Sequence, residues 1–317
     1  MPKVKSPPFK KENPKGEINL FKLEDSVDYK KMKEVGSGNH IYYSCLIAKA
    51  KNENRYAREF VEHYINIGVE KFYFGDEDPE FVENLSDVLD DYIKKGIIDI
   101  EFIYHRNINI QNFYEYAYKA VKLRCKWILL FDFDEFLEFT DKNMTLKTYL
   151  EMPIFDNCDV IRIHWLVYDD NNLLTYDNRT LKERFSHPSD DKELEVYHKS
   201  IVRGKDYGVN MFVEYNSIHQ PSPLVTKQCG AIGNEEKPGD GIMLPPQYQY
   251  CYLRHYTYKT AEEFAFKMLR GGNPNESYNF DDILGYFFRI NQFSEEKLKI
   301  IENIVNRTFS QYHKSNN

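Results

Sequence analysis

The stretch IYYSCLIAKAKNENRYAREFVEHYINIGVEKFYF, residues 41–74, decides the fold. Its first part, IYYSCLIA (41–48), is rich in β-branched and aromatic residues and predicts a buried strand. Apolar residues then recur at helical spacing over 55–67, and Gly68 ends the helix that they predict. VEKFYF (69–74) predicts a second strand. The stretch is therefore a strand–helix–strand unit.

The same alternation continues along the chain. A helix over 79–95, opened by Pro79, is followed by the strand IIDIEFIY (97–104). A further helix spans about 110–124, and KWILLF (126–131) is an apolar run of the kind expected for a central parallel strand. The order βαβαβαβ predicts an α/β fold with a mostly parallel, doubly wound sheet, whose ligands bind at the carboxyl ends of the strands.

After residue 136 the pattern becomes less regular. Shorter β-like pieces are predicted at 159–168, 195–203, 211–218 and 248–254. The stretch 225–247 is rich in glycine and proline and is a candidate long loop. Three helices are predicted near the end of the chain, over 261–270, 281–290 and 294–312.

Composition limits the classes of function. The 317 residues, 42% of them hydrophobic, suffice for one large domain or two small ones with a sizeable core. The net charge of −8 argues against nucleic acid as a partner. No apolar run is long enough for a membrane span, and the N-terminus has no apolar signal region.

Two features bear on the compartment. The five cysteines are an odd number without zinc spacing, which favours reduced thiols and a cytoplasmic protein: Cys45, Cys125, Cys158, Cys229 and Cys251. Residues 1–35 form a basic tail rich in proline and lysine. This tail is expected to be a solvated leader or to make weak peripheral contact with a membrane surface.

The main chemical feature is FDFDEF (131–136), at the end of the fourth predicted strand. In an extended segment Asp132 and Asp134 project to one side and Glu135 to the other, so two carboxylates can share a ligand. Paired carboxylates suit Mg²⁺ or Mn²⁺ beside a substrate phosphate. The alternative is that these acids are solvated or cap the following turn.

Three motifs in the same order carry a resemblance to a known family. They are AKNENRYAREFVEHYINIGVEKFYFGDED (50–78), KWILLFDFDEFLEF (126–139) and LRHYTYKTAEEFAFKMLRGG (253–272). The chain from about 40 to 272 resembles glycosyltransferases of the GT-A fold, of family 92 and the related family 2-like group. That resemblance implies a Rossmann-like sheet flanked by helices, and a nucleotide-sugar donor as co-substrate.

The resemblance also implies roles for individual residues. Asp132 and Asp134 would serve the divalent ion and the donor ribose, with Asp134 as the more direct metal ligand, and His255 would be a further ligand to the metal or diphosphate. Lys259, Lys267 and Arg270 would neutralise the diphosphate. For these residues the alternatives are a packed histidine and a solvated basic face.

The ends of the first two strands are expected to form the nucleoside pocket, because their polar side chains stand at the ligand-binding edge. The candidates are Lys49, Asn52, Glu53, Asp76 and Asp78. Gln111 and Asn112 correspond to polar positions near the nucleotide in the family. Loop polarity and helix capping are equally good explanations for each of them singly.

An inverting transfer needs a carboxylate base on the acceptor side. Asp170 is the first choice, with Asp169 in the same HWLVYDDNN segment (164–172) and Glu214 as the other candidates. The related proteins more often carry Phe-Gly where this chain has Tyr168-Asp169, which weakens transfer of the acceptor site. Lys199 and His219 also match family positions, in donor, acceptor or packing roles.

The leading hypothesis is a metal-dependent, inverting glycosyltransferase that moves a sugar from a UDP-sugar to a saccharide or glycoconjugate acceptor. A metal-dependent phosphohydrolase and a catalytically silent carbohydrate-binding module are the alternatives. Residues 36–258 would form the catalytic domain, with the nucleotide-sugar half ending near residue 136 and the acceptor half after it. Residues 259–317 would form a helical segment packed on that domain.

Overall fold

The computed structural model describes residues 20–23, 27–35, 39–77, 83–103, 108–190, 192–212, 221–237, 245–269 and 280–315. These residues fall into two compact units. The larger unit contains the described chain up to Trp165 together with Glu195–Arg254, and the smaller contains Leu166–Leu194 together with the residues from His255 onward. Each unit is described by itself.

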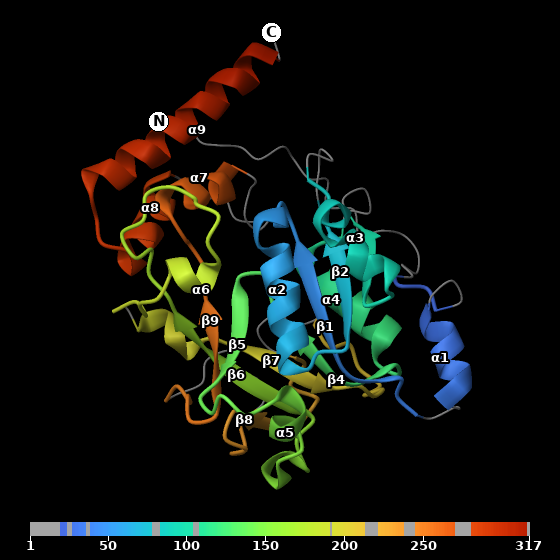
Figure 1. Cartoon of the computed structure of the whole chain (residues 1–317). Coiled ribbons are helices and arrows are strands. Elements are labelled where there is room, and N and C mark those ends of the chain that lie inside the picture. Colours follow the sequence, from blue (N-terminus) through green and yellow to red (C-terminus); the bar gives the residue numbers. More distant parts are fainter. Residues whose placement is uncertain are drawn as a thin grey trace. The chain divides into compact units, whose positions relative to one another are not determined.

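The first half of the larger unit has the predicted alternation of strands and helices (Figure 1). Its strands are β1 (Tyr42–Ala50), β2 (Lys71–Asp76), β3 (Ile98–Phe102) and β4 (Cys125–Leu130). They are parallel and lie in the order β3-β2-β1-β4. The connecting helices are α2 (Asn54–Ile67), α3 (Leu85–Lys94) and α4 (Ile110–Val121). The predicted α/β fold is therefore confirmed.

Alternation along the strands divides the core of this sheet into two faces. Phe113 and Ala117 of α4 belong to a buried cluster with Cys45 and Ile47 of β1. On the other face, the Phe60 ring of α2 lies 4.6 Å from Phe133 and 6.3 Å from Phe74 of β2. Helix α2 ends at Gly68, whose φ of 109° is the left-handed conformation that glycine adopts without strain.

The second half of the sheet is mixed. The described part of the chain has nine strands in one sheet, and beyond β4 the order continues β7-β6-β9-β5, with β8 paired to β6. Strand β7 (His198–Arg203) is antiparallel to both β4 and β6 (Val160–Val167). The remaining strands are β5 (Glu135–Phe139), β8 (Gln228–Gly230) and β9 (Cys251–His255).

Several details differ from the sequence prediction. The strand β8 interrupts the predicted loop over 225–247, and the short helix α5 (Leu146–Leu150) was not predicted. The predicted strand at 211–218 has no counterpart at Met211 and Phe212, and its remainder lies outside the described residues. Pro79 lies outside them as well.

The smaller unit is mainly helical, as predicted for the end of the chain. Its helices are α6 (Leu181–Arg184), α7 (Ala261–Leu269), α8 (Phe280–Ile290) and α9 (Glu295–Ser315). Phe264, Phe287 and Ile301 share a buried cluster that joins the last three of these helices. Among the helices of the described residues, none combines the length and the apolar content of a membrane span.

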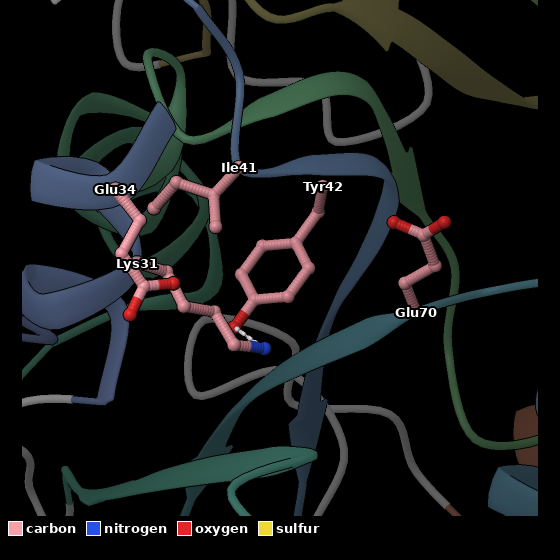
Figure 2. A pocket seen from close by; sticks show the side chains of 5 residues that line it. All are labelled: Lys31, Glu34, Ile41, Tyr42 and Glu70. Atoms are coloured by element: carbon pink, nitrogen blue, oxygen red, sulfur yellow. Dashed lines mark hydrogen bonds between the residues drawn. The ribbon is translucent and has the colours of Figure 1, made fainter. Parts of the chain in front are cut away.

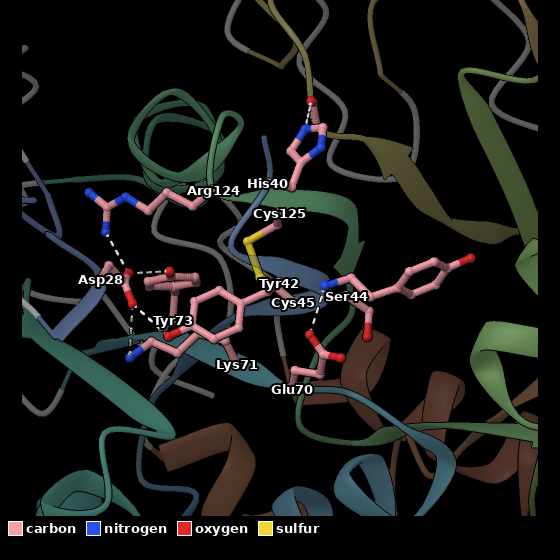
Figure 3. Close-up of a disulfide and its surroundings, with 12 residues drawn as sticks. Asp28, His40, Tyr42, Ser44, Cys45, Glu70, Lys71, Tyr73, Arg124 and Cys125 are labelled. Carbon is pink, nitrogen blue, oxygen red and sulfur yellow. Dashed lines mark hydrogen bonds and ion pairs between the residues drawn. A yellow bond between two sulfur atoms is a disulfide. The ribbon is translucent and has the colours of Figure 1, made fainter. Parts of the chain in front are cut away.

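Part of the predicted N-terminal tail is ordered on the larger unit. Helix α1 (Val27–Val35) buries Asp28, whose carboxylate accepts hydrogen bonds from the hydroxyls of Tyr42 and Tyr73, at 2.8 and 2.6 Å (Figure 3). The Arg124 guanidinium lies 3.0 Å from the same carboxylate. A buried charge is stable only with such partners, so Asp28 fixes α1 against the sheet.

The prediction of five reduced thiols is wrong. Two disulfides join Cys45 to Cys125 and Cys158 to Cys229, each pair with its Cα atoms 5.9 Å apart, and Cys251 is free and buried. Cys45 and Cys125 lie on the neighbouring strands β1 and β4, as Figure 3 shows. Wide spacing in the sequence misled the prediction, because strand pairing brings residues 80 positions apart into contact.

Candidate active site

The predicted donor-binding residues of the larger unit lie at one edge of its sheet. Ala50 of β1 is in register with Asp76 of β2, and Ile47 of β1 is in register with Leu130 of β4. The carboxyl ends of these parallel strands therefore coincide, which is where open α/β sheets bind ligands. The residues at or just after these ends are Lys49, Asn52, Glu53, Asp76, Asp132 and Asp134.

The acidic motif forms a tight turn and not an extended strand, which corrects the basis of the prediction. β4 ends at Leu130, and the backbone N–H of Glu135 donates to the carbonyl of Asp132 at 3.0 Å. Because the chain reverses here, the Glu135 carboxylate folds back and accepts the N–H of Asp132 at 2.9 Å. Glu135 therefore belongs to the same cluster as Asp132 and does not face away from it.

Two donors from other elements hold the Asp132 carboxylate. The hydroxyl of Tyr114, from α4, donates to Oδ1 at 2.8 Å. The ammonium of Lys199, from β7, contacts Oδ2 at 2.5 Å and lies 3.6 Å from Oε2 of Glu135. Lys199 reaches this place because β7 is antiparallel to β4 and begins where β4 ends.

Charge in this turn is distributed unevenly. Burial alone raises the pKa of Asp132, but the ammonium of Lys199 and the Tyr114 hydrogen bond outweigh it and leave that pKa below its usual range. For Glu135, burial dominates and raises the pKa well above its usual range despite Lys199. Asp132 is therefore the ionised partner of Lys199, whose own pKa is raised because Asp132 and Glu135 outweigh its burial.

The other polar residues at this edge have structural contacts of their own. Lys49 and Glu77 form an ion pair at the ends of β1 and β2. Asp76 is buried, and its Oδ2 accepts the N–H of Leu85, the first residue of α3, at 2.9 Å. Asp76 thus helps to cap a helix, which was the alternative explanation for it.

Gln111 and Asn112 stand in the first turn of α4. The helix is capped by Asn109, whose side-chain oxygen accepts the N–H of Asn112 at 2.8 Å. Gln111 is half-buried and Asn112 is buried. Asn52, on the loop after β1, has a φ of 53°, the left-handed conformation that asparagine tolerates better than most residues.

In the smaller unit, the candidate bases lie next to the end of β9. The N–H of Tyr168 donates to the carbonyl of His255 at 3.1 Å, which brings the segment with Asp169 and Asp170 beside His255. Asp170 is buried, and its Oδ2 lies 2.7 Å from the ammonium of Lys297 on α9. Asp169 is half-buried, and its Oδ1 accepts the N–H of Asn171.

The basic candidates of the smaller unit lie on or before α7. Lys259 is buried with a φ of 59°, an uncommon conformation for a lysine. Lys267 donates to the carbonyl of Thr257 at 2.6 Å. The predicted residues that lie outside the described part of the chain are Asp78, Glu214, His219 and Arg270.

A family comparison decides the class of the protein. The sequence model of glycosyltransferase family 92 matches residues 50–209, which is half of the chain and includes the acidic turn and Lys199. The chain belongs to glycosyltransferase family 92. The resemblance seen in the sequence is thereby confirmed, and this family 92 protein is a glycosyltransferase.

Solved structures with a similar fold include crystal structures of S. aureus TarS 1–349. One of them is 15% identical to the family 92 chain. The match covers 77% of the family 92 chain and 70% of the TarS chain, with a TM-score of 0.38. The complex of TarS with UDP-GlcNAc is 14% identical, with coverages of 82% and 79% and a TM-score of 0.39. No curated protein matches the chain.

Sequence reasoning missed Tyr114 and gave Lys199 no definite role. Tyr114 follows Gln111 by three positions, one helical turn, so its closeness to a predicted contact was the available signal. A hollow of about 380 Å³ in the family 92 enzyme is lined by Lys31, Glu34, Ile41, Tyr42 and Glu70 (Figure 2). It lies where β1 begins, at the sheet edge opposite the acidic turn, and contains none of the predicted site residues.

Proposed function

We propose that this family 92 glycosyltransferase transfers a sugar from a UDP-sugar to a saccharide or glycoconjugate acceptor, with a divalent metal ion and with inversion. The observation that carries the proposal is the acidic turn after β4, where Asp132 and Asp134 stand at the ligand-binding edge of the parallel strands. A phosphohydrolase is the weaker candidate, because nothing in the family match favours it.

The donor set of this turn suits Mg²⁺ or Mn²⁺. In the described residues no three His, Cys, Asp or Glu side chains gather into a metal cage. Such ions are often bound through one or two carboxylates plus substrate phosphate oxygens, which the pair Asp132 and Asp134 can provide. Oε1 of Glu135 is buried in the same turn without a hydrogen-bond partner among the described residues. When bound, the ion would stabilise the negative charge of the departing diphosphate.

The reaction itself needs a base on the acceptor side. The acceptor oxygen forms a bond to the anomeric carbon of the sugar, and the bond from that carbon to the diphosphate oxygen breaks with its electron pair. The hydroxyl proton passes to a carboxylate. Asp169, Asp170 and Glu214 remain the proposed candidates. We favour Asp169, because Asp170 is buried and paired with Lys297.

The division of labour along the chain stays part of the proposal, with donor binding before residue 136 and acceptor binding after it. For His255, Lys259, Lys267 and Arg270, the roles in diphosphate and metal binding that the family resemblance implies stay part of the proposal. Disulfides are typical of oxidising compartments, so we now propose such a compartment in place of the cytoplasm. Peripheral membrane contact through the N-terminal tail remains a proposal.

Asp134→Asn tests the proposed reaction. Loss of the carboxylate should lower the release of UDP from UDP-sugars with Mn²⁺ by at least about 100-fold, because the proposed ion, whose positive charge would stabilise the leaving group, loses a ligand. The control is Asp156→Asn, which removes an exposed carboxylate outside the turn and should leave the rate unchanged. The same assay with a panel of UDP-, GDP- and CMP-sugars identifies the nucleobase of the sugar donor. Full activity of Asp134→Asn, or hydrolysis of simple phosphates by the wild type, would contradict the proposal.

A further inference from the structure

Both oxygens of the Asp132 carboxylate are engaged by buried protein donors. Oδ1 accepts from the Tyr114 hydroxyl at 2.8 Å, and Oδ2 accepts from the Lys199 ammonium at 2.5 Å. The two donors approach from α4 and β7, so the carboxylate is fixed at both of its ends. Such a carboxylate has one orientation, in contrast to a solvated strand-end acid.

Two carboxylates surround the buried ammonium of Lys199. Its side chain is 1% exposed, and its ammonium contacts the carboxylates of Asp132 and Glu135. Separating a buried ammonium from its carboxylate partners is strongly unfavourable. Lys199 therefore stays at Asp132.

We propose that Tyr114 and Lys199 are positioning residues that hold Asp132 in the orientation in which it meets the nucleotide donor. The proposal rests on the function proposed above. A carboxylate has about four lone-pair sites, so two remain for the nucleotide-sugar after both protein contacts are made. Groups fixed in advance bind more tightly, because little side-chain freedom is lost when the ligand arrives.

The same contacts separate the roles of the two aspartates. Asp132 shares its charge with Lys199, which leaves less of it for a cation. This agrees with the roles that the family resemblance implies, in which Asp134 is the more direct metal ligand and Asp132 serves the ribose hydroxyls. A hydroxyl donates to a carboxylate without needing its full charge.

Tyr114→Phe is the decisive variant, since it removes one hydroxyl and keeps the ring. The matched control is Tyr118→Phe on the same helix, whose hydroxyl donates to the carbonyls of Arg203 and Lys205 at 2.9 and 3.0 Å, away from the acidic turn. The probe is UDP with Mn²⁺, titrated into the full chain by calorimetry. We expect Tyr114→Phe to weaken UDP binding by about 5- to 10-fold. Tyr118→Phe should leave UDP binding unchanged, and urea unfolding should show that both variants fold.

Lys199→Met is a second variant for the same UDP titration. It should weaken UDP binding more than Tyr114→Phe does, because Asp132 then faces Glu135 without the intervening cation. If Lys199→Met does not fold, Tyr114→Phe decides alone. Equal UDP binding by the wild type and Tyr114→Phe would overturn the positioning role, as would equal weakening by Tyr118→Phe. A wild type that binds none of UDP, GDP and CMP would instead overturn the proposed function, and the positioning role with it.

Discussion

Removing the charge of Lys297 should destabilise the smaller unit strongly. The Lys297 ammonium lies 2.7 Å from Oδ2 of Asp170 and donates to the carbonyl of Gln292 at 2.8 Å, and its side chain is 2% exposed. Lys297→Met keeps most of the side-chain volume but leaves the buried Asp170 carboxylate and the Gln292 carbonyl without this donor. Breaking a buried ion pair from one side costs about 3 to 5 kcal/mol.

Urea unfolding at neutral pH measures this loss in the free energy of unfolding. The control is Lys299→Met on the same helix, where the lysine is 69% exposed and 3.7 Å from Glu295. An exposed pair of this kind contributes about 0 to 0.5 kcal/mol. The double variant Lys297→Met with Asp170→Asn should recover part of the loss, because no buried charge then remains. A loss for Lys297→Met no larger than that for Lys299→Met would refute the reasoning.

The loss of stability in Lys297→Met should also depend on pH, through the protonation of Asp170. Burial raises the pKa of Asp170 above 3.8, although Lys297 lowers it. A carboxyl with a raised pKa stabilises the fold in its protonated form, and this contribution is lost as the pH rises through the folded-state pKa. Without Lys297 that pKa rises further. The deficit of Lys297→Met relative to wild type should therefore be largest at neutral pH and shrink as the pH is lowered.

Two further predictions concern the larger unit. Gly204→Ala should cost about 3 kcal/mol in urea unfolding, because its Cβ would lie 1.7 Å from the backbone carbonyl oxygen of Cys125. The control is Gly285→Ala, at an exposed position of α8 in the smaller unit with open space around it, which should cost nothing. Alkylation of the unfolded, unreduced protein followed by mass spectrometry should find one alkylated thiol, at Cys251, and five alkylated thiols after reduction. Five alkylated thiols without reductant would disprove both disulfides and the proposed oxidising compartment.

Much of the fold followed from local patterns. The helices α2 and α4 and the strands β1 and β4 lie within a few residues of their predicted bounds, because apolar periodicity and Gly68 act over short distances in the chain. Less was predictable beyond β4. Strand β8 has three residues and pairs with β6 across more than 60 positions, so its own sequence carried little signal.

The acidic turn shows the same limit on a smaller scale. The sequence placed Asp132 and Asp134 at the end of a strand, and they lie there. The prediction from the sequence assumed an extended backbone. In the structure, however, the hydrogen bond from the N–H of Glu135 to the Asp132 carbonyl closes a turn. For Asp170, the sequence offered a candidate base. Its partner Lys297 lies 127 positions away, and no local pattern relates the two.

By itself the sequence determined the alternation of strands and helices, the edge of the sheet that holds the polar residues, and the family. The first two follow from periodicity along neighbouring residues and from the rule that parallel strands end at a common edge, and the family follows from the resemblance of three motifs. Only the tertiary structure decided which charges meet, as for Asp132, Tyr114 and Lys199, and which cysteines pair. Such contacts depend on distances between elements far apart in the chain, and packing sets those distances.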